Sequence, residues 1–167
     1  AALEVAIKSL RLSKNSEIIV PARSFFSSAS CIVNTGYIPV FADVNLLTQN
    51  ILIDDIKKKL TKKTKAIICV HLAGLPCDMN SIKKLANKKK IKIIEDCSQA
   101  HGASIDNKQV GSFGDISTWS FCNDKIMSTL GEGGMISTNK KKLYEICKRS
   151  INHGKNFKNN KNTEKFI

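Results

Sequence analysis

The sequence predicts an α/β protein, a three-layer α/β/α arrangement around a mostly parallel sheet. Six apolar runs of strand length alternate with helical patterns along the 167 residues. Four of these runs are continuously apolar, which is typical of strands that are covered on both faces. Alternating strands and helices favour parallel strands joined by right-handed helical crossovers. A chain of this length buries roughly two-thirds of its unfolded surface, so we expect one domain or part of one.

The predicted elements alternate in type along the chain. The strand-length runs are rich in Ile and Val, whereas the helical segments space their apolar residues among lysines. Strands are expected at 17–22, 37–44, 66–72, 91–97, 116–122 and 134–139. Helices are expected at 3–12, 24–35, 51–60, 80–90 and 140–150.

The composition argues against a membrane protein and makes a nucleic-acid-binding protein the less favoured interpretation. The net charge of +13 would suit a nucleic-acid surface, but the lysines come with only three arginines and few interleaved aromatic residues. A solvated basic surface is therefore favoured, and a non-catalytic basic protein that binds nucleic acid is kept as an alternative. No apolar run reaches the ~18 residues of a membrane helix, and the first ten residues lack the features of a signal peptide.

The six cysteines are widely spaced and form no C-x-x-C pair. Several of them lie in strand-like runs such as "AIICVHL". This pattern is typical of buried, reduced thiols, so we expect a cytoplasmic protein.

Asp96 is the first candidate site residue, because ligands of such sheets gather at the carboxyl ends of the strands. It ends the predicted strand "IKIIED". Its carboxylate should project at that edge, while Glu95 should point to the opposite face. A carboxylate there can pair with a cationic ring nitrogen, although an Asp that caps the next segment is a common alternative.

Lys125 is the second candidate, in the stretch "SFCNDKIMSTLGEGG". Ser120 precedes it, and the glycine cluster 131–134 allows close approach of the backbone. A partly desolvated lysine amine can attack a carbonyl group. A lysine among small donors indicates an anionic ligand, although most lysines of such a chain are simply exposed.

The long segment "IIEDCSQAHGASIDNKQVGSFGDISTWSFCNDKIMSTLGEGGMISTN" resembles the core of the DegT/DnrJ/EryC1/StrS family of sugar aminotransferases. The similarity continues upstream through "EIIVPARSFFSSASCIVNTGYIPVFADVN" and downstream to "RSINHG", so it covers nearly the whole chain. The family consists of pyridoxal-phosphate enzymes of fold type I. The resemblance therefore implies the large, cofactor-binding domain of that fold.

The resemblance implies a role for each of five residues. Lys125 would anchor pyridoxal 5'-phosphate covalently and shuttle the proton, and Asp96 would pair with the pyridinium nitrogen. Gln99 would hydrogen-bond the ring hydroxyl, and Ser120 would bind the phosphate. Phe25 would stack on the ring.

Other aromatic residues and histidines are not assigned to catalysis. Phe26 is expected in the core at the start of a helix. His71 and His101 match recurrent family histidines, but backbone partners explain them equally well, and His153 is a weaker candidate still. No metal ligands are predicted.

The activity that the resemblance implies is transfer of an amino group to a keto group of a nucleotide-linked sugar, in amino-sugar or polysaccharide biosynthesis. Glutamate is the expected amino donor, and a homodimer is expected without nucleic acid or membrane. A related sugar dehydratase is the alternative enzyme, but in that branch histidine replaces the anchoring lysine.

Family members are more than twice as long as this chain, which indicates truncation at both ends. Residues 1–154 would form the cofactor-binding large domain without its first phosphate-binding turn. Residues 155–167 would form a polar loop that leads to a missing C-terminal small domain. We therefore expect the isolated 167 residues to bind the cofactor weakly or not at all.

Overall fold

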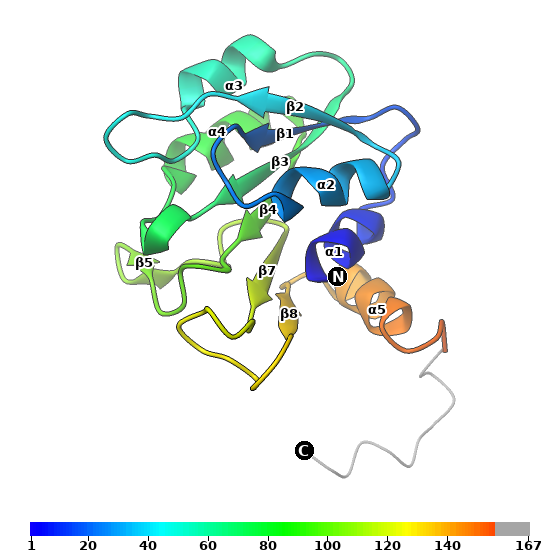
Figure 1. Cartoon of the computed structure of the whole chain (residues 1–167). Helices are drawn as coiled ribbons and strands as arrows, with labels where there is room; N and C mark the ends of the chain where they lie inside the picture. The colour runs from blue at the N-terminus through cyan, green and yellow to red at the C-terminus, as the bar shows by residue number, and fades with distance from the viewer. Residues whose placement is uncertain (156–167) are drawn as a thin grey trace.

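The computed structural model describes residues 1–155 and confirms the predicted three-layer α/β/α architecture (Figure 1). One six-stranded sheet has the order β2-β1-β3-β4-β7-β8. Its strands are β1 Glu17–Pro21, β2 Ile38–Ala42, β3 Thr64–Val70, β4 Lys92–Asp96, β7 Ile116–Ser120 and β8 Gly134–Ser137. The first five of these pair in parallel, and only the edge strand β8 runs antiparallel, to β7.

Within residues 1–155, five α-helices cover the two faces of the sheet. They are α1 Ala2–Ser9, α2 Ser27–Asn34, α3 Ile53–Lys59, α4 Met79–Lys89 and α5 Lys141–Ser150. On β3, Ile68 packs with Ile7 of α1 and Ile32 of α2. Its neighbour Ile67 packs with Ile82 of α4 on the other face. Both faces of the strand are buried, which explains why the central strands are continuously apolar.

The two larger core clusters of the described residues lie on opposite faces of the sheet, and a third, small cluster contains Cys97, Ala100 and Val110. Helices α1, α2 and α5 contribute to one cluster, and α3 and α4 contribute to the other. Figure 1 shows α1, α2 and α5 together on one side of the strands. Side chains at alternate positions of each strand face different helices, so neighbouring residues at a strand end meet different surroundings.

Two short features were not predicted from the sequence. A hairpin joins β5 Ser104–Ile105 to β6 Lys108–Gln109, and a 3₁₀ helix spans Leu72–Gly74. The hairpin turns at Asp106 and Asn107, which both have positive φ angles. Strands of two residues are too short to produce a pattern of alternating hydrophobicity, so the sequence carries little signal for them.

The structure describes only part of the two segments into which the sequence is predicted to divide, 1–154 and 155–167. The elements from α1 to α5 lie within the predicted large domain, 1–154. Of the predicted polar loop 155–167, residues 156–167 lie outside the described residues. None of the helices within residues 1–155 has the length and apolar content needed to span a bilayer.

Five of the six cysteines are buried, as the sequence predicts, and Cys122 is partly exposed. All six are free thiols. Burial raises the pKa of both Cys31 and Cys77 to about 12. These thiols are therefore neutral at physiological pH and behave as small apolar residues.

Candidate active site

A cavity of about 620 Å³ lies at the carboxyl ends of the central strands. It borders the side of the sheet that α1 and α2 cover, and residues that follow β1, β4 and β7 contribute to its wall. All five residues singled out from the sequence line this one cavity: Phe25, Asp96, Gln99, Ser120 and Lys125. The fold thus brings together residues that are up to 100 positions apart in the sequence.

Asp96 lies at the wall of the cavity and is only 4 % exposed. Its Oδ1 accepts hydrogen bonds from the hydroxyl of Ser98 at 2.6 Å and from the Ser98 N–H at 3.2 Å. Its Oδ2 accepts a hydrogen bond of 3.3 Å from the hydroxyl of Ser28, on α2. The side chain therefore faces the side of the sheet that α1 and α2 cover.

Glu95 points to the opposite face and is fully buried. Its Oε1 accepts from the N–H groups of Phe113 and Gly114 at 2.8 and 2.6 Å. Its Oε2 accepts from the Gly111 N–H at 2.8 Å and lies 3.2 Å from Nε2 of His71. Burial pushes the pKa of Glu95 upward, but the hydrogen bonds from His71, Gly114 and Gly111 outweigh burial and lower the pKa. Glu95 is a charged structural anchor for the segment 111–114.

Lys125 lies on the loop between β7 and β8. Its backbone N–H donates to the carbonyl of Cys122 at 3.0 Å, which closes a turn at the end of the strand. The side chain is 19 % exposed, and its Nζ lies 2.9 Å from Oδ2 of Asp124, whose side chain is 70 % exposed. Lys125 lowers the pKa of Asp124 through this hydrogen bond. Both Lys125 and its exposed partner Asp124 line the cavity.

Gln99 and Ser120 each have one polar atom fixed by the backbone. Oε1 of Gln99 accepts from the Ala73 N–H at 2.7 Å, which leaves the amide NH₂ group as a donor. Oγ of Ser120 accepts from the Cys122 N–H at 3.3 Å, which leaves its hydroxyl hydrogen as a donor. Both residues line the cavity with Asp96. They can therefore donate to acceptor oxygens of an anionic ligand.

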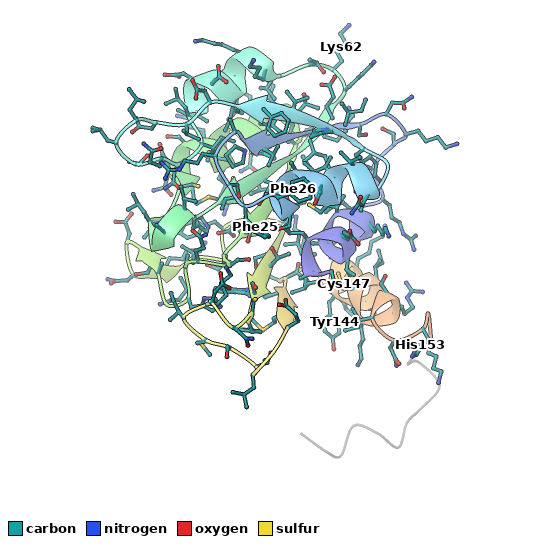
Figure 2. The ribbon with its side chains drawn as sticks, viewed as in Figure 1. Phe25, Phe26, Lys62, Tyr144, Cys147 and His153 are labelled. Atoms are coloured by element: carbon teal, nitrogen blue, oxygen red, sulfur yellow. The ribbon has the colours of Figure 1, made fainter. Side chains whose placement is uncertain are left out.

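The aromatic pair before α2 lies at the surface. Phe25 lines the cavity and is 72 % exposed, so its ring has a face available to a ligand. Phe26 is 78 % exposed, so the prediction that it belongs to the core is wrong. Figure 2 shows both residues at the N-terminal end of α2. Phe26 immediately precedes the first helical residue, Ser27, at the rim of the layer, where little of the described chain covers it.

None of the three histidines lines the cavity. His71 is fully buried, with Nδ1 accepting from the Cys77 N–H at 3.0 Å and Nε2 next to Glu95. His153 is exposed in the turn after α5. His71, Glu95 and Cys97 each have an atom that could ligate a metal ion, and these atoms lie within 4.8 Å of one another. Both ring nitrogens of His71 already have partners, so a hydrogen-bond network explains this group.

His101 stacks at an angle between Trp119 and Phe121, with ring centroids 5.4 and 5.6 Å away. Within residues 1–155, neither of its buried ring nitrogens has a hydrogen-bond partner. Backbone partners, one of the two explanations left open for His101, are therefore not found among the described residues. Its contacts are aromatic, and they support the start of the loop that carries Lys125.

Sequence reasoning missed several residues of the cavity and its support. Ser24, Ser98 and Glu132 also line the cavity, and Ser28 lies behind it against Asp96. The only sequence signal for Glu132 was its place in "GEGG", which also fits a simple turn. Serines in a serine-rich stretch carry no signal by themselves, because their partners are set by the packing of α2 against β4.

Comparison with known proteins supplies the family. The model of the DegT/DnrJ/EryC1/StrS aminotransferase family matches residues 1–166. The chain belongs to this family. A GDP-perosamine synthase from Escherichia coli O157:H7 is 47 % identical over 146 residues, which cover 87 % of this chain and 40 % of that protein.

Two solved structures have the same fold as this chain. An aminotransferase from Psychrobacter cryohalolentis superposes with a TM-score of 0.92 at 50 % identity, covering 93 % of this chain and 40 % of that one. The Bacillus subtilis protein ntda, with bound cofactor PMP, superposes with a TM-score of 0.83 at 34 % identity, covering 89 % and 33 %. The fold is therefore that of the type I pyridoxal-phosphate-dependent aminotransferases. The chain spans about 40 % of the length of the curated relatives named GDP-perosamine synthase from Escherichia coli O157:H7 and Vibrio cholerae.

Proposed function

We propose that this chain carries the cofactor site of a pyridoxal-phosphate-dependent aminotransferase that aminates a nucleotide-linked keto sugar. One observation carries the proposal: Lys125, Asp96 and the exposed ring of Phe25 line a single cavity at the carboxyl edge of the sheet. A primary amine, a buried carboxylate and an exposed aromatic face are the groups that an aldehyde-bearing, cationic, flat heterocycle requires. The residues present thus fit the cofactor.

Each residue has a role that its position supports. Lys125 holds the cofactor covalently and moves a proton at its Nζ, and Asp96 keeps a cationic ring nitrogen in place by its charge. Phe25 orients the ring by stacking, Ser120 donates to the phosphate and Gln99 donates to the ring hydroxyl. When bound, the cofactor supplies the electron sink for the exchange of the amino group.

The substrate class follows from the relatives. GDP-perosamine synthase from Escherichia coli bears the name of a GDP-linked amino sugar, so a keto sugar linked to a nucleotide is the proposed acceptor. An amino acid, glutamate in our proposal, supplies the amino group. We further propose that the complete protein acts as a homodimer in the cytoplasm, for amino-sugar or polysaccharide biosynthesis. The lysine-rich surface, the free cysteines and the absence of a spanning helix in residues 1–155 are compatible with that place.

The two alternatives are less well supported. A sugar dehydratase of the same fold would carry histidine where this chain has Lys125. A non-catalytic nucleic-acid binder would have no use for a cavity that combines Lys125, Asp96 and Phe25.

The test is made on protein expressed from the complete reading frame that holds these residues. Adding pyridoxal phosphate should give the yellow absorbance band of a lysine-linked cofactor, and glutamate should bleach it. Borohydride should fix the cofactor on Lys125, as located by peptide mass spectrometry. Lys125→Ala should lose both signals, whereas Lys58→Ala, at an exposed lysine of α3, should keep them.

An unchanged band in Lys125→Ala would refute the proposal. Salt-dependent retention on nucleic acid that ignores Lys125→Ala would instead support the basic-protein alternative.

A further inference from the structure

We propose that Ser28 is a positioning residue, which acts through Asp96 with help from Ser98 and Ser24. The inference rests on the proposed function, because it concerns how the carboxylate that faces the cofactor nitrogen is held. Ser28 does not belong to the cavity wall and is only 1 % exposed. It therefore cannot act on a ligand directly and acts through the side chain in front of it.

Both oxygens of Asp96 have neutral hydrogen-bond donors. Oδ2 accepts from the Ser28 hydroxyl at 3.3 Å, and Oδ1 accepts from the hydroxyl and N–H of Ser98 at 2.6 and 3.2 Å. The donors come from two different elements, α2 and the segment after β4. Hydrogen bonds at both oxygens fix the rotation of the carboxylate plane, which a single donor would leave free.

The chemical nature of these donors matters for the proposed partner of Asp96. Neutral hydroxyl and amide groups stabilise a carboxylate without neutralising it, whereas an ammonium or guanidinium group would compete for its charge. The full negative charge of Asp96 stays available to a cationic group in the cavity. Asp96 itself is only 4 % exposed, so water screens its charge less than that of a surface carboxylate.

Ser24 extends the hydrogen bonds to the cavity wall. Its Oγ lies 2.7 Å from Oγ of Ser28, and Ser24 lines the cavity while Ser28 does not. Because the single hydroxyl hydrogen of Ser28 points to Asp96, Ser24 is the donor in this pair. The chain Ser24 to Ser28 to Asp96 is a directional series, and each bond polarises the next.

The first experiment reads Asp96 directly, without cofactor. Protein labelled with ¹³C at the aspartate carboxyl carbon gives an Asp96 signal, which Asp96→Asn assigns. Ser28→Ala should shift this signal, and Ser28→Thr, which keeps the hydroxyl, should leave it near its original position. Ser9→Ala is the matched control, because Ser9 is also a buried helical serine, but its hydroxyl donates to the Ala6 carbonyl at 2.7 Å.

The second experiment reads the consequence for cofactor binding, by titration of the yellow band. Ser28→Ala should weaken the affinity for pyridoxal phosphate about three- to tenfold, as expected for one hydrogen bond of ordinary strength, since this bond is 3.3 Å long. Ser24→Ala should have a smaller effect in the same direction. Ser9→Ala should leave the affinity unchanged.

The outcomes separate this inference from the proposed function. If Ser28→Ala changes neither the Asp96 signal nor the affinity while Lys125→Ala abolishes the band, the inference is overturned and the proposed function stands. If Ser28→Ala lowers only the thermal stability, Ser28 is a packing residue and the inference is equally overturned. If Lys125→Ala keeps the band, the proposed function fails, whatever Ser28 does.

Discussion

The two carboxylates at the end of β4 are neighbours in sequence but have opposite surroundings. Glu95 lies against the segment 111–114 and His71, with four hydrogen-bond partners and no exposed surface. Asp96 lies on the other face, where it is held by two serines and borders the cavity that Lys125 also lines. One strand therefore carries a closed structural anchor and an open candidate catalytic group side by side.

The difference shows that burial alone does not identify a functional carboxylate. Glu95 is the more buried of the two and its pKa is clearly lowered, yet all its acceptor capacity is used within the protein. Asp96 has neutral donors and a cavity in front of it. The group with remaining capacity toward a cavity is the one that can serve a ligand.

The largest expected effect comes from removing the charge of Asp96, the carboxylate that borders the cavity. Asp96→Asn should lower the rate of amino transfer about 10³-fold, because an amide cannot hold a cationic ring nitrogen by charge. The thermal unfolding temperature should change little. Steady-state kinetics with glutamate and calorimetry on the same samples measure both effects. A variant that stays fully active would show that Asp96 merely caps the segment after β4.

Replacing Glu95, the fully buried carboxylate, should instead lower the stability of the fold. Glu95→Gln should destabilise the protein by about 3 kcal/mol, because the new NH₂ group faces backbone N–H groups that need an acceptor. Chemical denaturation measures the loss. Asp96→Asn is the matched control, with the same change of carboxylate to amide one residue away. Equal losses of stability in the two variants would contradict the distinction between anchor and site.

The pH dependence of stability should sharpen the comparison further. The pKa of Glu95 is lowered in the folded protein from an ordinary value of 4.5, so its stabilisation is complete above that pH and is lost as the pH falls through the folded-state pKa. The free energy of unfolding should therefore fall on acidification below pH 4.5. Glu95→Gln should reduce this slope, by up to about 1.4 kcal/mol per pH unit. Identical slopes would show that Glu95 does not titrate as its hydrogen bonds imply.

The smallest expected effect concerns the exposed partner of Lys125. Asp124→Asn removes the carboxylate that lies 2.9 Å from Nζ, so the amine should react with the cofactor about two- to fivefold faster. Stopped-flow recording of the yellow band measures this rate, with Asp54→Asn on α3 as an exposed control. A slower reaction would mean that Asp124 orients the amine productively.

Particular residues show how far the sequence could be used. The alternation of a strand predicted that Asp96 and Glu95 face opposite sides, and both sets of hydrogen bonds agree. The proposed roles of Gln99, Ser120 and Phe25 came from the family resemblance, because a single glutamine, serine or phenylalanine does not by itself identify a role in ligand binding. The prediction that Phe26 belongs to the core was wrong, because apolar character alone does not show whether a residue at the rim of a layer will be covered.

The sequence by itself determined the order of the main strands and helices along the chain, and it predicted that candidate site residues follow the strands at their carboxyl ends. These properties are local or periodic, so they are written in neighbouring residues. Only the tertiary structure decided that Ser28 lies against Asp96, 68 positions away, and that His71 pairs with Glu95 rather than with a ligand. Such contacts depend on how a helix packs on a sheet, and no pattern within either segment encodes the distance between them.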